Sequence, residues 1–304
     1  MRLSPRLLAL FLPALLAACS SAEPAPAPLA LLEQEPIDLS PLGGDRPVEP
    51  YVPASYKPET PAPLVILLHG FGASGLLQEL VFRLREVSEE RGFLYLMPDG
   101  TLDADGKRFW NATDACCNRY GSEVDDVAYL RALIAEAKER FSVDPKRVYL
   151  VGHSNGGFMA HRMACDEAGA VAAVASLAGS TWLDPARCKP SEPVAVLQIH
   201  GTEDTSVLFE GELTSAEIGY PGADETTARW AELNGCDPTP QSAAPIDFSP
   251  DVDGPETTIT RFTAGCDGAS GAELWTMVGE RHVPGLSKSF SPAIVDFFFD
   301  HAKP

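Results

Sequence analysis

The sequence predicts an α/β protein with a mostly parallel central sheet and helices on both faces. Three observations support this prediction. Short apolar runs alternate along the chain with longer segments of helical periodicity, as strands and helices do in α/β proteins. The apolar runs are nearly continuous, as is typical of strands covered on both faces. A glycine-flanked serine, Ser154, stands between one such run and a helical segment, which predicts a tight turn from strand to helix.

The elements follow one another without an internal repeat or a second domain boundary. The predicted strands are 64–68, 93–97, 147–151, 171–177, 194–199 and 274–278. The predicted helices are 76–91, 124–141, 156–168, 223–234 and 292–302. In the second of these helices, Val127, Leu130 and Ile134 lie on one stripe, which indicates a face packed on a sheet. We therefore predict one α/β domain over residues 47–304.

The amino-terminal residues have the pattern of an export signal. Two arginines precede an apolar stretch, 7–18, that is too short to cross a bilayer. The sequence LAAC, ending at Cys19, resembles the lipobox of bacterial lipoproteins, in which the cysteine becomes the acylated first residue. We therefore predict a lipoprotein-type signal peptide over 1–18 and a lipid anchor at Cys19, with ordinary cleavage and a soluble product as the alternative. The Pro/Ala-rich stretch that follows predicts a semi-rigid tether over 19–46.

Composition and charge restrict the function classes. A chain of 304 residues, 45% of them hydrophobic, can bury a large core without help from metals. The formal net charge of -20 argues against nucleic-acid binding, which needs a basic surface. The same charge disfavours anionic membranes. We therefore predict membrane contact only through Cys19, in a protein that is exported and either anchored at the bacterial cell envelope or secreted. We further predict a monomer that uses no cofactor and no metal.

The cysteines agree with export. Apart from Cys19, six cysteines form an even set suited to an oxidising compartment. Short sequence separation favours two disulfides within this set: Cys165 with Cys188 and Cys236 with Cys266. The adjacent Cys116 and Cys117 are left as a vicinal disulfide or as two thiols. Zinc is the competing explanation, but no C-x-x-C or H-x-x-x-H ligand pair accompanies these two residues.

Ser154 is the candidate nucleophile. It is the centre of a G-x-S-x-G pattern that follows a predicted strand and precedes a predicted helix. Gly152 and Gly156 supply the small neighbours that such a corner needs, because strand, helix and substrate approach one another there. The alternative is a serine that merely caps the helix.

A serine nucleophile needs a base, and the base needs an acid to orient it. His282 lies in a loop just after the last predicted strand, whereas His301 is near the end of the terminal helix and is expected at the surface. His282 is therefore the predicted base. Asp204 directly follows the strand VAVLQI and its HGTE turn, and is the predicted acid. Glu203 is its near rival and Asp184 a more peripheral one.

The remaining site predictions concern backbone donors and pocket walls. The N–H groups of Asn155, which follows the nucleophile, and of Phe71, in the loop after the strand LVILL, are the predicted oxyanion donors. Trp110 and Trp182 each follow a predicted strand and are candidate walls of a substrate pocket, with a core position as the alternative. His153 flanks the nucleophile and is a further candidate for lining the cleft.

Several motifs together resemble one family. The segments LVILLHGFGAS, MPDGT, FWNATDACCN, VDDVAYLRALI, VGHSNGGFMAHRMAC, IHGTEDTSV and GERHVPG are similar to the secreted esterases that include polyhydroxybutyrate depolymerases and feruloyl or acetylxylan esterases. The resemblance covers almost all of the chain after Arg46. It implies an α/β-hydrolase fold, hydrolysis of carboxylic esters without a cofactor, and triad roles for Ser154, Asp204 and His282.

The chain departs from this family at two positions. Val283 stands where family members often have tryptophan, and 207–209 reads VLF where they often have V-P-Y. Both positions are expected to border the substrate, so the family's substrate preference is not carried over. The prediction is an exported serine carboxylesterase acting on polyhydroxyalkanoate, feruloyl, acetyl-glycan or short-chain esters. A serine peptidase, an acyltransferase and a non-catalytic surface binding protein that retains the fold are the alternatives.

Overall fold

The computed structural model describes residues 36–304 apart from 216 and 269. Its compact unit is Asp38–Pro304. The predicted signal peptide, Cys19 and most of the predicted tether lie outside the described residues. The end of that tether packs against the domain, because Leu42 is buried and pairs with Val48 through an isolated bridge. Among the described residues, no helix combines the length and apolar character needed to cross a membrane.

Each predicted strand and helical segment is present, together with strands that the sequence did not predict. The strands of the described residues are β1 Ala62–Leu68, β2 Leu94–Leu96, β3 Thr101–Leu102, β4 Arg108–Phe109, β5 Val143–His153, β6 Ala173–Leu177, β7 Ala195–Gly201, β8 Gly211–Leu213, β9 Gly219–Pro221, β10 Gln241–Ile246, β11 Thr257–Phe262 and β12 Ala272–Met277. The helices are α1 Gly75–Phe82, α2 Leu84–Arg91, α3 Asp126–Arg140, α4 Asn155–Asp166, the 3-10 turn η1 Pro185–Arg187, α5 Ala223–Leu233 and α6 Phe290–Asp300.

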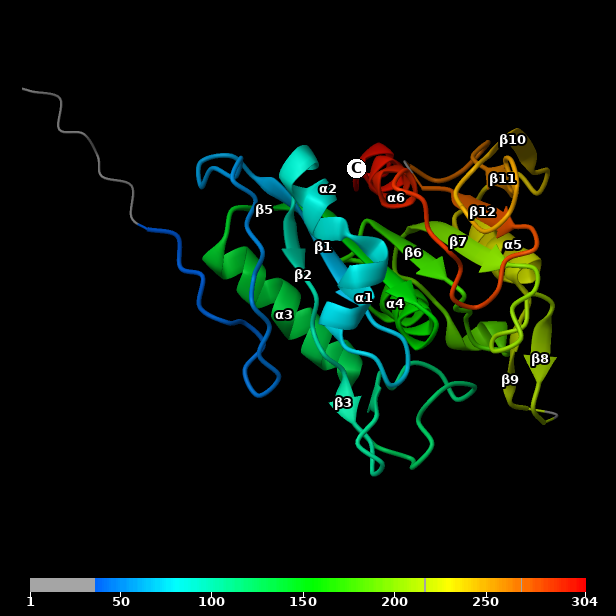
Figure 1. Ribbon diagram of the computed structural model, residues 1–304, viewed down its shortest axis with the longest axis horizontal. Coiled ribbons are helices and arrows are strands. Elements are labelled where there is room, and N and C mark those ends of the chain that lie inside the picture. Colours follow the sequence, from blue (N-terminus) through cyan, green and yellow to red (C-terminus); the bar gives the residue numbers. More distant parts are fainter. Residues whose placement is uncertain (1–35, 216, 269) are drawn as a thin grey trace, which may run out of the picture. The chain divides into compact units, whose positions relative to one another are not determined.

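The central sheet has the strand order β10-β11-β12-β7-β6-β5-β1-β2 within the described residues. Neighbours from β12 to β2 pair in parallel, and only β10 with β11 and β11 with β12 pair antiparallel. Two short hairpins, β3–β4 and β8–β9, stand outside this sheet (Figure 1). The predicted fold class, a mostly parallel sheet with helices, is therefore confirmed.

The sheet is covered on both faces because side chains alternate along each strand. In β1, Leu64 and Ile66 join a core that includes residues of α3, α4 and α5. Val65 and Leu67 point the other way, into a core with residues of α1, α2 and α6. All four side chains are at most 1% exposed, which explains why the strand reads as an unbroken apolar run.

The helix predicted over 76–91 is two helices, which corrects the prediction. The chain breaks at Arg83, whose φ of 54° is left-handed. The carboxylate of the buried Glu79 accepts the backbone N–H groups of Leu84 and Arg85 at 3.1 and 3.0 Å, and so caps the start of α2. It also accepts the hydroxyl of Tyr95 at 2.7 Å. A side-chain cap from the preceding helix therefore satisfies two backbone N–H groups at the start of α2, and helical periodicity alone does not reveal it.

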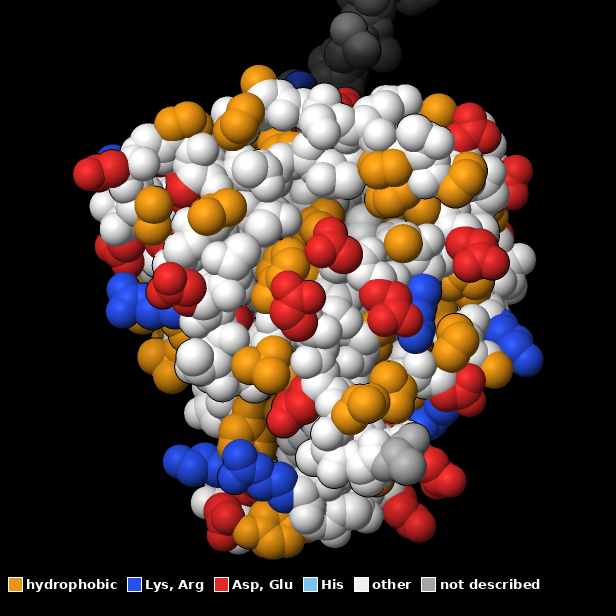
Figure 2. Space-filling view, turned by 90° about the vertical axis from the view of Figure 1, so that its right-hand side faces the viewer, with side chains coloured by type: hydrophobic (Ala, Val, Ile, Leu, Met, Phe, Trp, Pro, Cys, Tyr) orange, Lys and Arg blue, Asp and Glu red, His pale blue; other side chains and the backbone are white. Residues whose placement is uncertain are grey.

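The two antiparallel strands β10 and β11 were not predicted. β10 lies at the edge of the sheet, is largely exposed and contains Pro245, so it has no apolar run. β11 buries Thr257 and Ile259, but Thr258 between them is exposed and the residues after them are partly exposed, so β11 has no apolar run either. Figure 2 shows the face of the molecule on the side of β8 to β12, where acidic side chains are scattered among apolar ones.

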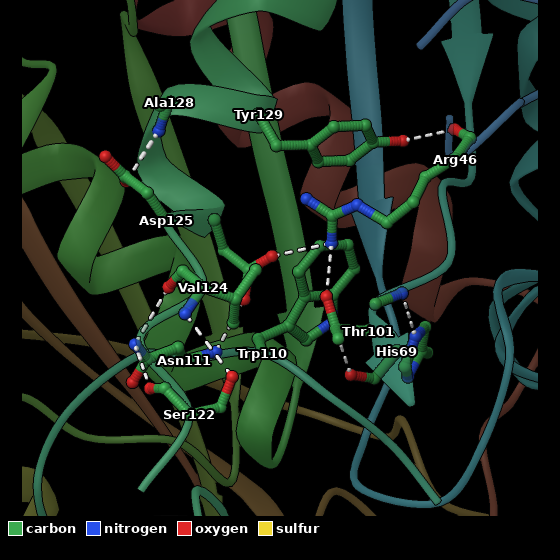
Figure 3. A network of polar contacts seen from close by, with 12 residues as sticks. Arg46, His69, Thr101, Trp110, Asn111, Ser122, Val124, Asp125, Ala128 and Tyr129 are labelled. Carbon is green, nitrogen blue, oxygen red and sulfur yellow. Dashed lines mark hydrogen bonds and ion pairs between the residues drawn. The ribbon is translucent and has the colours of Figure 1, made fainter. Parts of the chain in front are cut away.

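An ion pair between Arg46 and Asp126 joins the start of the domain to the first residue of α3. Nη1 of Arg46 lies 2.6 Å from Oδ1 of Asp126, whose side chain is fully buried. The guanidinium also lies 3.5 Å from the ring centroid of Tyr129 and donates to Thr101 Oγ1 (Figure 3). The second carboxylate oxygen of Asp126 accepts the backbone N–H of Asn111 at 2.7 Å. One buried carboxylate therefore joins three separate segments of the chain.

Replacing Arg46 by alanine is expected to lower the free energy of unfolding by about 3–5 kcal/mol, because it leaves the carboxylate of Asp126 buried without its cation. Urea denaturation monitored by tryptophan fluorescence measures the loss. The double variant Arg46→Ala/Asp126→Asn is the control, and it should lose less than the sum of the two single variants. A loss below about 1 kcal/mol for Arg46→Ala would mean that the pair behaves as an exposed one.

Candidate active site

Ser154 occupies a strained corner between β5 and α4. Its φ of 55° and ψ of -121° lie outside the regions that ordinary side chains favour. A Cβ atom at Gly152 would lie 2.1 Å from the carbonyl oxygen of Gly156, and one at Gly156 would lie 2.2 Å from that of Leu68. Both glycines are therefore required by the close approach of β5, α4 and β1. The packed surroundings hold the serine hydroxyl at the carboxyl edge of the sheet.

The structure brings Ser154, His282 and Asp204 together. Nε2 of His282 lies 2.9 Å from Oγ of Ser154, and its Nδ1 lies 2.7 Å from Oδ2 of Asp204. The geometry assigns the proton of the neutral ring to Nδ1, which donates to the carboxylate, while Nε2 accepts the serine hydroxyl. The side chain of His282 is 19% exposed and that of Asp204 is fully buried. The three side chains thus form a continuous hydrogen-bonded line from solvent to a buried charge.

Asp204 is held as a carboxylate by the loop that follows β7. Burial by itself raises the pKa of this group, but hydrogen bonds from His200 and His282 oppose it and lower the pKa well below its usual range. The backbone N–H groups of Ser206 and Val207 add to this effect by donating to Oδ1 at 2.8 and 2.9 Å. The carboxylate is therefore ionised at neutral pH and available to stabilise a cation on His282.

His153 lies between the elbow and the base. Nε2 of His153 donates to the carbonyl oxygen of His282 at 2.8 Å, and the two rings lie 4.9 Å apart. Burial lowers the pKa of His153 to about 4, and the neighbouring His282 also opposes its protonation. The neutral ring lines the apolar pocket at Ser154. His153 therefore both borders the predicted cleft and anchors the loop that carries His282.

The two predicted oxyanion donors flank the serine. A Cβ placed on Gly70 would lie 3.4 Å from Cβ of Ser154, so the loop carrying Phe71 passes directly beside this serine. Within the part of the chain that the structure describes, the backbone N–H groups of Phe71 and Asn155 donate to no protein acceptor. The side chain of Asn155 binds elsewhere, because Oδ1 accepts the backbone N–H of Trp110 and Nδ2 donates to its carbonyl oxygen.

Trp110 lines neither of the pockets at Ser154 and instead holds the core position that was its alternative. Its side chain is fully buried, and Nε1 donates to the carbonyl oxygen of His69 at 3.1 Å. The ring packs in the core with the α3 and α4 residues (Figure 3). Together with its backbone contacts to Asn155, this position fixes the loop of Phe71 relative to α4. Trp110 is therefore a positioning residue of the site.

Trp182 is also displaced from its predicted role. It is buried, and it borders a pocket with Asp114, Leu183, Asp184, Arg187, Glu217 and Ile218. That pocket does not include Ser154 or His282. Arg187 lies over the indole ring at 5.4 Å and pairs with Asp114. The tryptophan therefore packs beneath a surface ion pair.

Within the described residues, the alternatives to Asp204 and His282 make other contacts or lie exposed. Asp184 accepts the backbone N–H of Ala186 at 2.9 Å and so caps η1. Nδ1 of His301 donates to the carbonyl oxygen of Phe297 at the end of α6. Glu203 is exposed, and its backbone N–H donates to Glu280. The described residues contain no group of three or more His, Cys, Asp or Glu side chains arranged to hold a metal ion.

Two pockets meet at Ser154 and His282. The first, about 310 Å³, is mainly apolar and is lined by Gly70, Phe71, Ala73, Leu77, Gln78, Val81, His153, Ser154, His282 and Val283. The second, about 560 Å³, is lined by Phe71, Ala115, Cys116, Cys117, Arg119, Ser154, Phe158, Ser206, Val207, Glu212, Tyr220 and His282. Val283, where the sequence departs from the resembled family, borders the first pocket, and Val207, which precedes the other departure at 208–209, borders the second.

The structure contains three disulfides among the described cysteines. Cys165 pairs with Cys188 and Cys236 with Cys266, the two pairs favoured by the sequence. Cys116 and Cys117 form a vicinal disulfide. Nδ2 of Asn155 lies 3.7 Å from Sγ of Cys116, so this disulfide stands beside the elbow as well as in the wall of the second pocket.

Sequence reasoning missed the pocket residues that come from the segment 205–222. Tyr220 is buried, donates to Glu212 Oε2 at 3.2 Å and accepts the backbone N–H of Leu208 at 3.0 Å. Burial raises the pKa of Tyr220 to about 12. The short hairpin β8–β9 carries these residues, and its few residues have no periodicity to signal it. Arg119, which lies 4.5 Å over the ring of Phe71, was likewise missed.

Comparison with known protein families and sequences shows which family the chain belongs to. A model of a family described as phospholipase/carboxylesterase matches residues 51–218. Feruloyl esterase B of Piromyces equi is 30% identical over 200 residues, which are 64% of this chain and 36% of that protein. The putative esterase NocK of Nocardia uniformis subsp. tsuyamanensis is 28% identical over 245 residues, 77% of this chain and 69% of that protein. The chain thus spans about a third of the first relative's length.

The solved structures agree on the fold. The acetyl xylan esterase from Aspergillus awamori superposes with a TM-score of 0.60 at 16% identity, covering 88% of this chain and 98% of that one. A thermostable esterase superposes with a TM-score of 0.54 at 14% identity, covering 84% of this chain and 59% of that one. Because the family model spans more than half of the sequence, the chain belongs to the phospholipase/carboxylesterase family of α/β-hydrolases.

Proposed function

We propose that the protein is a serine esterase in which Ser154 is the nucleophile, His282 the general base and Asp204 the orienting acid. The observation that supports this most strongly is the unbroken hydrogen-bonded line from the strained elbow hydroxyl through the imidazole to the ionised, buried carboxylate. Such a line activates a weak nucleophile, because the proton that the hydroxyl loses has an acceptor in place.

The reaction would proceed in two halves. Oγ of Ser154 attacks the carbonyl carbon while its proton passes to Nε2 of His282, and Asp204 stabilises the resulting imidazolium. The tetrahedral intermediate collapses, and the leaving alcohol takes the proton from His282. Water then attacks the acyl-enzyme, giving one proton to His282, and the carboxylic acid leaves as Ser154 recovers its proton. The backbone N–H groups of Phe71 and Asn155 would hold the negative oxygen in both halves.

The two pockets suggest which ester is cut. An ester bond at Ser154 would place one side of the substrate in the apolar pocket and the other in the pocket with Arg119, Glu212 and Tyr220. We propose that the apolar pocket takes an acyl group and the polar one a hydroxylated alcohol such as a sugar. The similarity to feruloyl esterase B of Piromyces equi favours a hydroxycinnamoyl ester of a glycan. Acetylated glycans, polyhydroxyalkanoates and short-chain esters are the other candidate substrates.

A substrate panel tests this proposal. Hydrolysis rates are measured for p-nitrophenyl acetate, methyl ferulate, a feruloylated arabinoxylan oligosaccharide and a hydroxybutyrate oligomer, with a matched amide of ferulic acid as the control for peptidase chemistry. The proposal predicts the highest kcat/KM for the feruloylated oligosaccharide and no turnover of the amide. Turnover of the amide at a comparable rate would favour a serine peptidase. Accumulation of transesterified product when alcohols or sugars are added would favour an acyltransferase.

The vicinal disulfide Cys116–Cys117 offers a second test of the polar pocket. Changing both residues to serine removes a covalent constraint on the wall of this pocket, so the wall becomes more mobile and binds the alcohol side less tightly. KM for the preferred ester should rise about fivefold, equivalent to about 1 kcal/mol of binding, while kcat changes less than about twofold. Steady-state kinetics separate the two effects. An unchanged KM would place the substrate elsewhere.

We further propose that the protein is exported and held at the cell envelope by a lipid on Cys19, with residues 1–18 removed as a signal peptide and the stretch after Cys19 acting as a tether. Three disulfides in the described residues support an oxidising compartment. Metabolic labelling with a radioactive fatty acid tests the anchor, with Cys19→Ala as the control variant. Label on the control protein, or none on the parent, would contradict it.

A further inference from the structure

A chain of buried polar side chains runs from α5 to the loop that carries the acid. Nε1 of Trp230 donates to Nδ1 of His161 at 3.0 Å, and Nε2 of His161 lies 2.8 Å from Oε1 of Gln198. Nε2 of Gln198 lies 2.8 Å from the carbonyl oxygen of Gly179 and 3.2 Å from Nδ1 of His200. The four side chains are at most 1% exposed. Their polar atoms therefore depend on one another for partners.

The ends of this chain fix the direction of every hydrogen bond in it. An indole nitrogen only donates, so His161 accepts at Nδ1 and carries its proton on Nε2. That proton goes to Oε1 of Gln198, which turns the amide nitrogen toward Gly179, whose carbonyl oxygen only accepts. The same amide nitrogen donates to Nδ1 of His200. His200 therefore has its proton on Nε2, and two independent ends of the chain require this tautomer.

The proton on His200 reaches the acid loop. Nε2 of His200 donates to the carbonyl oxygen of Val207 at 2.8 Å and lies 3.4 Å from Oδ2 of Asp204. The backbone N–H of Val207 in turn donates to Oδ1 of Asp204. His200 thus contacts both the carboxylate of Asp204 and the turn 204–207, whose backbone N–H groups donate to that carboxylate. The ring of Phe209 packs edge-on at 5.7 Å and closes the remaining side.

A cation on His200 would conflict with this arrangement. A second ring proton would sit on Nδ1, where the N–H of Gln198 already points. The ionisable groups that face His200 are Asp204, in the loop that follows the strand β7 of His200, and His153 from the elbow, and His282 lies on the far side of the carboxylate. A cation at 3.4 Å would share the charge of Asp204 and weaken its stabilisation of an imidazolium on His282.

We propose that Gln198 and His200 are positioning residues of the triad: the buried chain keeps His200 neutral with its proton on Nε2, so that His200 fixes the acid loop and leaves the charge of Asp204 to His282. This inference rests on the proposed esterase function for its kinetic consequence, but not for the tautomer. It explains why Gln198 and His200 are buried next to the acid loop and why their hydrogen bonds all run in one direction.

The tautomer is measured directly on the wild-type protein. Nitrogen-15 NMR of protein labelled in its histidine rings distinguishes a protonated from an unprotonated ring nitrogen, and His200→Gln assigns the signal. At pH 7 the inference requires His200 to be protonated at Nε2 and unprotonated at Nδ1. An imidazolium, or a proton on Nδ1 alone, would overturn it.

Gln198→Glu replaces the donor to Nδ1 by an acceptor of the same size, and should draw a proton onto that nitrogen. We expect kcat to fall about tenfold, the effect of losing about 1.4 kcal/mol of transition-state stabilisation, with KM changed less than about twofold. The acid limb of the kcat/KM profile should move to lower pH, because an imidazolium on His282 is less stabilised. Gln241→Glu adds the same charge on an exposed edge strand and should leave the profile unchanged. A Gln198→Glu profile identical to wild type would overturn the inference.

A second pair of variants covers the case in which Gln198→Glu does not fold. His200→Gln keeps an N–H near the position of Nε2, whereas His200→Leu removes it. We expect kcat of the first to stay within about threefold of wild type and that of the second to fall at least about tenfold. Equal activities in the two variants would overturn the inference. A wild-type protein that cleaves no ester would instead refute the proposed function, since the NMR result is independent of turnover.

Discussion

The Ser154→Ala variant is expected to lose about 10⁴- to 10⁶-fold in kcat on the best ester of the panel, because the attacking oxygen is removed while the pockets stay intact. KM should change little, since Oγ lies at the junction of the pockets and contributes little binding area. The residual rate reports what the oxyanion donors and binding achieve without a nucleophile. Steady-state kinetics at high enzyme concentration measure it.

A covalent probe supplies the control for this variant. A fluorophosphonate should label the wild-type protein once, at Ser154, and should not label Ser154→Ala. Urea denaturation should give similar midpoints for the two, because alanine keeps the same strained backbone at φ 55°. Wild-type ester hydrolysis by Ser154→Ala would contradict the proposed mechanism. A wild-type protein that neither reacts with the probe nor cleaves any ester would favour the binding-protein alternative.

Replacing Asp204 by asparagine should lower kcat by about 10⁴-fold, the loss typical of a triad acid exchanged for its amide. The amide would present a donor where Nδ1 of His282 needs an acceptor at 2.7 Å, so the ring would turn or change tautomer and no longer accept the proton of Ser154. Glu203→Gln is the matched control, because Glu203 is the neighbouring exposed acid, and it should remain within about twofold of wild type. Comparable losses in both variants would contradict the assignment of the acid.

The same variant has a pH-dependent effect on stability. The pKa of Asp204 is lowered in the folded protein, so its contribution to stability is present above the unfolded-state pKa of about 3.9 and is lost as the pH falls through the lower folded value. The difference in unfolding free energy between wild type and Asp204→Asn should therefore be largest near neutral pH and shrink below about pH 4. Urea titrations at pH 7 and pH 3.5 measure it. A difference that grows on acidification would contradict the lowered pKa.

Tertiary contacts explain the errors of the sequence-based predictions. Trp110 follows a strand near the cleft, as a pocket wall would, but its indole N–H binds the carbonyl oxygen of His69 and faces the core. The helix expected over 76–91 breaks at Arg83, where Glu79 caps the second half and is itself held by the hydroxyl of Tyr95, a set of contacts that no periodicity reveals. The edge strand β10 escaped prediction because an exposed strand with a proline lacks the apolar run that marks a buried one.

The sequence by itself determined the α/β fold class, the order of its main strands and the elbow at Ser154, because buried parallel strands and glycine-flanked corners are local patterns that leave a direct trace in residue order. It also singled out His282 and Asp204, since parallel strands deliver the loops after them to one edge. Only the tertiary structure decided what surrounds them: the two pockets, the vicinal disulfide beside Asn155, and the buried chain through Gln198 and His200. These depend on distances between segments far apart in the chain, and hydrogen-bond direction is set there by which atoms meet.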